Sequence, residues 1–154
     1  MLRLTDTPSG QMRHLFDAEL GYQDGMAPIR ELDDRGHLVG SGTGRVEGPD
    51  ISGTLRWSNF EQVFGDHCRL NVVGLIETDD GAEIRFDSQG FGLPPTGAEG
   101  GAWKVASAVR FAVADARYRW LEAALAVWEG EFYATTATAR YRAYIGAGPY
   151  NDEV

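Results

Sequence analysis

Two side chains of this sequence, Glu77 and His14, have the chemistry of a general acid or base and stand in segments of alternating polarity. Such alternation predicts half-buried β-strands, whose successive side chains point to opposite faces. We expect both side chains on the inner face of the fold. A buried carboxylate has a raised pKa because loss of water disfavours its charged form, which suits Glu77 to moving a proton.

Each of these groups also has a purely structural interpretation. Glu77 can be a rim carboxylate paired with an arginine, and His14 a hydrogen-bonded core or surface histidine. The single cysteine, Cys68, can be a small buried residue. A nucleophilic thiol would need a nearby base, and the adjacent His67 would point to the opposite face of a strand.

Amide and aromatic residues are the candidates for holding a ligand. Asn59 and Asn71 can bind a carbonyl or hydroxyl group, although buried amides more commonly satisfy backbone groups. Trp57, Tyr118 and Trp120 can stack on an aromatic ligand, with core packing as the alternative.

The dipeptide Asp80-Gly81 separates two alternating segments and predicts a β-hairpin with a two-residue turn. That register places Glu77 opposite Ile84 and fixes which residues share a face. The more apolar face, expected to point inward, consists of Asn71, Val73, Leu75, Glu77, Ala82, Ile84, Phe86 and Ser88.

Turn residues punctuate further strand-like segments along the whole chain. Glycines at 40, 42 and 44 share one face of such a strand, which allows another backbone to approach closely or the sheet to coil. A helical turn is expected over 115–121 with Asp115 as its N-cap, in competition with a longer helix over 115–127. Residues 21–36 form a long loop that we suspect is a lid. The remaining strands are expected over 14–20, 38–47, 51–57, 105–113, 124–132 and 136–145.

These elements predict an all-β fold, a single antiparallel β-barrel of about eight or more strands, calycin-like or allene-oxide-cyclase-like, with at most one short helix. The 154 residues suit one domain over 1–154, with loose tails at 1–11 and 146–154. The net charge of −9, with no two adjacent cationic residues, argues against nucleic acid or an anionic membrane surface as a partner.

Nothing in the sequence predicts a metal or a cofactor. The three histidines lie far apart, and the glycines of residues 40–44 are not followed by the Lys-Ser/Thr of a phosphate loop. One cysteine cannot form an internal disulfide, and no apolar run has the length of a signal peptide or membrane helix. We therefore expect a cytoplasmic protein that works without a cofactor.

Three blocks of the sequence resemble a known family in the same order. They are Gly44–Pro49 with Ile51–Gly53, Thr78–Ala82, and Arg117–Leu121. The family is the uncharacterised small β-barrel family called domain of unknown function 3237, and the resemblance spans residues 13–145. It implies a barrel and no particular activity.

Several polar positions of the family pattern are changed in this chain. Two acidic residues of the pattern align with Asn59 and Asn71, and an arginine aligns with Val73. If those positions line the family pocket, the resemblance implies a related pocket that is more apolar and less charged.

Together these features favour a lyase, isomerase or cyclase that acts by acid–base chemistry on a small, mostly apolar or aromatic metabolite inside the barrel, at the end bearing Glu77. The alternatives are a non-catalytic small-molecule-binding barrel and an oligomeric interaction module. We also expect a homodimer or larger homo-oligomer, because Val72 and Ile76 would point outward and residues 125–132 are apolar on both faces.

Overall fold

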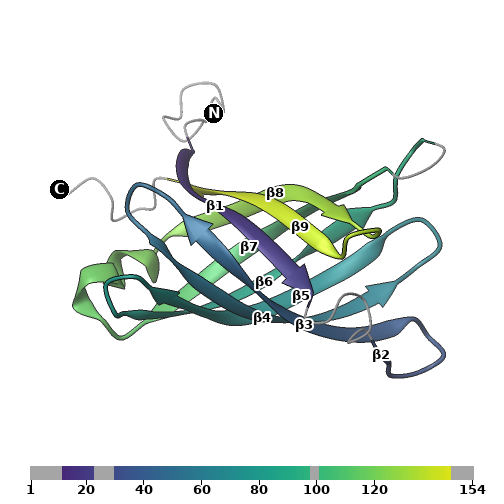
Figure 1. Cartoon of the computed structure of the whole chain (residues 1–154), viewed down its shortest axis with the longest axis horizontal. Helices are drawn as coiled ribbons and strands as arrows, with labels where there is room; N and C mark the ends of the chain where they lie inside the picture. Colours follow the sequence, from purple (N-terminus) through teal and green to yellow (C-terminus); the bar gives the residue numbers. More distant parts are fainter. Residues whose placement is uncertain (1–11, 23–29, 98–100, 147–154) are drawn as a thin grey trace, which may run out of the picture.

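Segments of alternating polarity fold into long antiparallel strands that close into a barrel (Figure 1). The computed structural model describes residues 12–22, 30–97 and 101–146. Eight of the nine strands in these residues form the barrel, and the two-residue β2 (Arg30–Glu31) is added beside β3. The barrel strands are β1 (Arg13–Tyr22), β3 (His37–Glu47), β4 (Ser52–Val63), β5 (Cys68–Thr78), β6 (Glu83–Leu93), β7 (Trp103–Val113), β8 (Leu125–Tyr133) and β9 (Thr138–Gly146).

The barrel is a simple meander closed by its first strand. Strands β3 to β9 each pair with the next strand along the chain, and β1 lies between β9 and β3. Closure pairs all the long strands on both sides, so none of them is left as an edge. The predicted antiparallel barrel is confirmed.

The interior is packed by large side chains around Trp128. Phe86 and Phe16 both meet its ring edge-on, with centroids 5.3 Å and 6.4 Å away. The glycines of β3 make room in this core, since a Cβ on Gly42 would lie 1.9 Å from the Gly21 carbonyl oxygen and 2.8 Å from the Trp57 ring. Glycine at this position therefore lets β1 and Trp57 pack against β3, as its spacing predicted.

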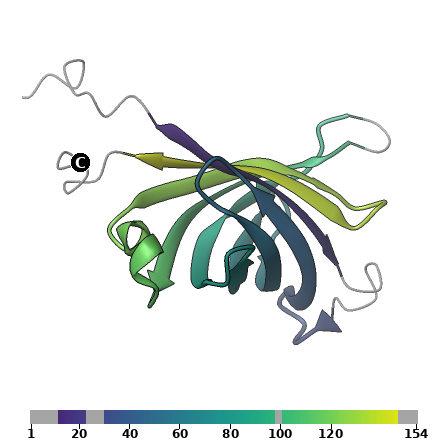
Figure 2. The same cartoon turned by 60° about the vertical axis from the view of Figure 1, so that its left-hand side comes forward.

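A short 3-10 helix, η3 (Ala116–Leu121), covers one end of the barrel (Figure 2). Asp115 caps it by accepting a hydrogen bond from the Arg117 amide, and Tyr118 and Leu121 are buried. The Tyr118 hydroxyl donates to Asp80 Oδ2 over 2.6 Å, which ties η3 to the β5–β6 hairpin. The predicted helical turn is confirmed, and the longer helix is wrong because β8 begins at residue 125.

The β5–β6 hairpin exists, but its predicted register is wrong by one residue. The loop has three residues rather than two: the Gly81 amide donates to the Thr78 carbonyl over 3.0 Å, and Gly81 has φ 91°. A turn followed by such a left-handed glycine is a common three-residue hairpin loop. Glu77 therefore lies opposite Glu83 rather than Ile84.

This shift reverses the faces of β5. The β6 side chains predicted to point inward do so, but the buried residues of β5 are Cys68, Leu70, Val72, Ile76 and Thr78. Asn71 and Glu77 lie on the outer face, because a shift of one residue moves every side chain of a strand to the other side.

The start of β1 also departs from simple alternation. The β1–β9 register shifts between His14 and Phe16, so that Leu15 and Phe16 are both buried. Such a bulge changes the face of every residue before it. His14 is therefore exposed and bonds to Asp17 Oδ1 over 2.9 Å, and its predicted inward position is wrong.

Some predicted segments fall partly outside the described residues. Residues 23–29 of the suspected lid lie outside them, as do residues 1–11 and 147–154 of the predicted tails. The end of the 21–36 segment that is described contains β2 and a turn with Gly36 at φ 80°. No helix within the described ranges is long and apolar enough to cross a membrane.

Candidate functional site: a cavity at the open end of the barrel

A cavity of about 270 Å³ opens at the end of the barrel opposite η3. It lies where β1, β4 and β8 end and β5, β7 and β9 begin, at the right-hand end of Figure 1. The end bearing Glu77, where the ligand was expected, is covered by η3 instead. The lining residues are Leu20, Tyr22, Trp57, Asn59, Glu61, Val63, Cys68, Leu70, Val72, Trp103, Val105, Phe132, Ala134, Ala139 and Tyr141.

Glu61 is the one carboxylate among these lining residues. It stands near the end of β4, on the face that continues Trp57 and Asn59. Burial raises the pKa of Glu61, and a hydrogen bond from Asn59 opposes part of this rise. A carboxylate whose pKa is raised binds a proton more tightly than an exposed one, which makes it a stronger base.

Asn59 is held in an orientation in which its side-chain amide nitrogen points toward Glu61. Its Oδ1 accepts a hydrogen bond from the backbone amide of Asn71 over 3.3 Å. Because that amide can only donate, the other end of the side chain is Nδ2, which donates to Glu61 Oε2 over 3.2 Å. The amide thus fixes the carboxyl group against the cavity wall.

Two tyrosines bring phenol groups to the same cavity. Burial and then the nearby Glu61 raise the pKa of Tyr22 to about 12. Burial also raises the pKa of Tyr141. Both phenols therefore keep their protons at neutral pH and can donate hydrogen bonds to an oxygen atom.

Aromatic rings form much of the remaining wall. The Tyr22 ring meets Trp57 edge-on with centroids 4.7 Å apart, and it meets Phe132 at 5.8 Å. The Trp57 indole donates to the Thr43 carbonyl over 3.4 Å, so its polar atom is satisfied by the barrel itself. The walls therefore present mainly apolar surface to a ligand.

Cys68 lines the cavity but is not prepared for nucleophilic attack. Burial, and after it the nearby Glu61, raise the pKa of its thiol to about 11. A thiol with a raised pKa stays protonated and unreactive at neutral pH. The structure agrees with the interpretation of Cys68 as a small buried residue.

The residues proposed from the sequence are divided between the two ends of the barrel. Asn59 and Trp57 line the cavity. Asn71 lies on the outer side of the wall, although its backbone amide supports Asn59. Tyr118 and Trp120 belong to η3 at the closed end, where the Arg13 guanidinium lies 5.7 Å from the Trp120 ring centroid.

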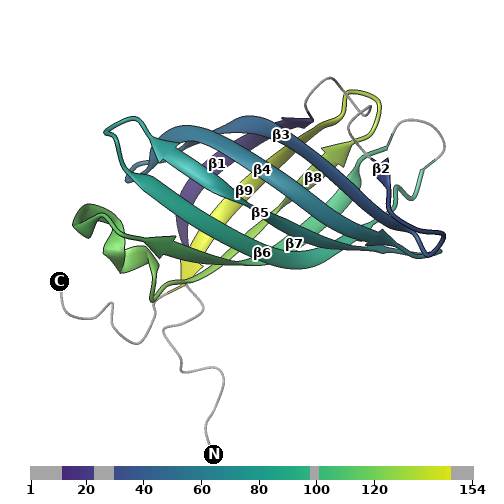
Figure 3. The ribbon, with the colours of Figure 1, turned by 90° about the horizontal axis from the view of Figure 1, so that it is seen from below.

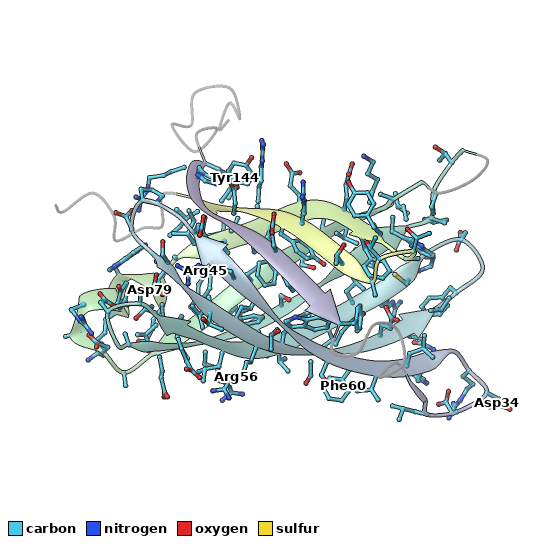
Figure 4. The ribbon with its side chains drawn as sticks, viewed as in Figure 1. Asp34, Arg45, Arg56, Phe60, Asp79 and Tyr144 are labelled. Atoms are coloured by element: carbon cyan, nitrogen blue, oxygen red, sulfur yellow. The ribbon has the colours of Figure 1, made fainter. Side chains whose placement is uncertain are left out.

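Glu77 is also outside the cavity. It forms an ion pair with Arg56 on the outer wall, and both side chains are about half exposed. Figure 4 shows Arg56 pointing away from the barrel below β4. Of the two interpretations of Glu77, the structure favours the carboxylate paired with an arginine.

Sequence reasoning missed Glu61, Tyr22 and Tyr141, although the signal was present. The alternation that placed Trp57 inward continues for two more steps, through Asn59 to Glu61. The alternation of β1 that places Leu20 inward likewise leads to Tyr22. Extending the alternation of β4 and β1 to the ends of these strands would have found Glu61 and Tyr22.

The described part of the chain holds no group of three His, Cys, Asp or Glu side chains arranged to bind a metal ion. Its histidines form pairs with single acids instead. His37 Nδ1 lies 2.6 Å from Asp33, and His67 Nδ1 lies 2.6 Å from Asp66.

Solved structures with the same barrel come from several organisms. A β-barrel-like protein from Acinetobacter baumannii superposes with a TM-score of 0.75 at 21% identity, covering 88% of this chain and 95% of that one. A conserved protein of unknown function from Rhodopseudomonas palustris gives a TM-score of 0.74 at 18% identity, covering 88% and 97%. A protein described as an enzyme from Penicillium herquei gives 0.61 at 24% identity, covering 94% and 99%.

No curated protein matches the sequence significantly. The sequence model of a family described as "Protein of unknown function (DUF3237)" matches residues 11–145. That match spans nearly all of the barrel and confirms the resemblance noted from the sequence. The chain therefore belongs to the DUF3237 family.

Proposed function

We propose that the protein is a cofactor-independent enzyme, a lyase, isomerase or cyclase, that acts on a small, mostly apolar or aromatic molecule held in the cavity. The observation that carries the proposal is Glu61, a carboxyl group with a pKa raised by burial, in a cavity otherwise lined by apolar side chains and phenols. Perturbed titratable groups in apolar cavities are typical of sites that move protons.

In the proposed mechanism Glu61 is the general base. Its carboxylate takes a proton from a carbon or hydroxyl group of the ligand, and the electrons left behind move to an oxygen of the ligand. Tyr22 and Tyr141 donate hydrogen bonds to that oxygen as its negative charge grows. The proton then returns from Glu61 to another atom of the same molecule, which gives an isomer or a cyclised product with no change in overall charge.

The size of the cavity limits the ligand. Its volume of about 270 Å³ is near the lower end of small-molecule sites, which are roughly 300–1,000 Å³. A compact molecule of one or two rings fits such a space better than a chain or a polymer. One similar barrel is described as an enzyme, which makes the fold compatible with catalysis.

The first experiment is a search for proton transfer rather than for a named product. A panel of small enolisable ketones and phenols is incubated with the protein in D₂O, and NMR follows binding and deuterium incorporation at carbon. The proposal expects at least one compound that the natural protein converts to an isomer or labels with deuterium, and a Glu61→Gln variant that still binds this compound without either change. Binding with neither conversion nor incorporation by the natural protein would favour the alternative of a non-catalytic binding barrel.

We further propose that the protein is a homodimer or larger assembly. The first reason for this expectation was wrong, because Val72 and Ile76 point inward. The second reason keeps its basis, because β8 exposes Leu125 on the outer wall, with 67% of its surface accessible. An exposed large apolar side chain of this kind is a candidate contact point between subunits. Light scattering at micromolar concentration, with a Leu125→Ser variant beside the natural protein, tests this: a monomer in both would exclude it.

A further inference from the structure

The pairing of β4 with β5 is interrupted beside Glu61. The register of β4 with β5 is continuous up to the pair of Asn59 and Val72, skips Phe60 and Glu61, and resumes at Gln62. On its other side β4 stays paired with β3 through the same two residues. The unpaired stretch therefore lies between β4 and β5 only, two strands that Figure 3 shows side by side.

A side chain replaces the missing backbone contact. In a continuous antiparallel ladder the Asn71 amide would face Phe60, its partner by register. It donates instead to Asn59 Oδ1 over 3.3 Å. The side-chain oxygen of Asn71 itself is buried and has no hydrogen-bond partner in the described protein atoms. Buried polar groups without a protein partner are typical of places that water reaches.

The interruption lies between the cavity and a groove on the outer wall. Glu61 and Leu70, which face each other across it, border both the inner cavity and this groove. Asn71 and Gln89 border the groove and are paired with each other between β5 and β6. At this point two successive residue pairs without regular ladder pairing separate the cavity from the groove.

We propose that the interruption is a side passage through which Glu61 exchanges its proton with water in the outer groove while a ligand fills the mouth of the cavity. The proposal rests on Glu61 acting as the proposed base. A proton that Glu61 has taken from the ligand passes to a water molecule in the passage, which leaves Glu61 ionised for the next event. In the reverse direction, a water molecule in the passage returns a proton to the Glu61 carboxylate.

The passage would change what the enzyme can do with its ligand bound. Without it, a proton on Glu61 can leave only after the ligand has left the mouth, so the proton must return to the same molecule. With it, the reaction can end with a net proton gained or lost by the ligand. The titratable or charged groups around Glu61 are Tyr22, Cys68 and Tyr141 in the cavity, and Asp33, His37 and Arg69 beside the groove.

The test measures proton exchange directly and needs no substrate. The protein is mixed rapidly with D₂O at a pH where Glu61 is protonated, and infrared spectroscopy follows the conversion of its COOH band to COOD. The Glu61→Gln variant identifies the band. The mouth is narrowed by Val63→Trp with Ala134→Trp, two accessible positions of the cavity rim, and the passage is closed by Asn71→Leu.

The side passage predicts that narrowing the mouth changes the exchange rate by less than about threefold, and that adding Asn71→Leu slows it at least about tenfold. A matched Val73→Leu, two residues away on the same outer face, should have no effect. If Asn71→Leu does not fold, Gln89→Leu closes the groove from β6. Slow exchange on narrowing the mouth alone, or unchanged exchange on closing the groove, would overturn the passage. Neither result would bear on whether Glu61 is the base, because turnover is not measured.

Discussion

Asn59 donates a hydrogen bond to Glu61 over 3.2 Å from a position fixed by the backbone amide of Asn71. Burial and this hydrogen bond act on the pKa of Glu61 in opposite directions, with burial the larger effect. Two neighbouring inward positions of β4 thus form a unit in which one side chain sets the proton affinity of the other.

Removing the donor should raise the pKa of Glu61 further. An Asn59→Leu variant keeps the burial and loses the hydrogen bond that stabilises the carboxylate. The ¹³C chemical shift of the Glu61 carboxyl carbon, followed through a pH titration, should move its midpoint upward relative to the natural protein. The variant also leaves the Asn71 amide without its acceptor, which should cost about 1–3 kcal/mol of unfolding free energy. A midpoint that falls or stays constant would contradict this account of the pair.

The raised pKa of Glu61 makes a specific prediction for stability against pH. A carboxyl group that holds its proton more tightly in the folded state stabilises the fold at low pH, and this contribution is lost as the pH rises from the ordinary value of about 4.5 through the folded pKa. The glutamine variant has no such pH dependence. The unfolding free energy of Glu61→Gln minus that of the natural protein should therefore be larger at pH 8 than at pH 4. Urea unfolding of both proteins at both pH values measures this quantity, and the same value at pH 4 and pH 8 would argue against a buried carboxylate with a raised pKa.

The closed end of the barrel offers a separate test of how the fold is held. Tyr118 donates to Asp80 in the β5–β6 loop, and this bond joins two of the family-like segments of the sequence. Tyr118→Phe should lower the unfolding free energy by about 0.5–1.5 kcal/mol, the usual net value of one hydrogen bond. Tyr144→Phe is the matched control, because Tyr144 is partly exposed and meets His14 only ring to ring, with centroids 5.9 Å apart. Equal losses in the two variants would show that the hydroxyl of Tyr118 contributes nothing particular.

The glycines of β3 predict a sharp contrast between two alanine substitutions. A Cβ at Gly42 would lie 1.9 Å from a backbone oxygen of β1, whereas one at Gly65 meets nothing within 4 Å. Gly42→Ala should therefore destabilise the barrel by about 2 kcal/mol or more, since the backbone of β1 must move. Gly65→Ala should stay within about 0.5 kcal/mol of the natural protein. Thermal unfolding of both variants compares them, and a harmless Gly42→Ala would mean that β1 is free to shift.

The barrel itself follows from the alternation of the sequence. The two faces that were predicted wrongly have physical causes. Asp80-Gly81 correctly marks a hairpin, but both two-residue and three-residue loops use a glycine with positive φ. That one ambiguity moved Glu77 to the wrong face. The bulge beside His14 puts two adjacent apolar residues, Leu15 and Phe16, into the core, and strict alternation counted back from Leu20 passes over it.

The candidate site was harder to predict because it depends on which end of the barrel stays open. Tyr118 and Trp120 look like ligand-binding aromatics in the sequence, yet they belong to the helix that covers the other end. Glu61 lay within reach of the same alternation that placed Trp57, had the strand been extended to its end. Strand ends are where local patterns are weakest, since turns and cavities interrupt them.

The comparison of Glu61→Gln with Glu77→Gln tests the central claim most directly. Both substitutions remove one carboxylate and keep its shape, but only Glu61 lines the cavity, while Glu77 pairs with Arg56 on the outer wall. With a compound from the D₂O screen, Glu61→Gln should lower turnover by about 10²-fold or more with binding largely kept, and Glu77→Gln should leave turnover unchanged. Full turnover in Glu61→Gln, or an equal loss in both variants, would contradict the assignment of Glu61 as the base.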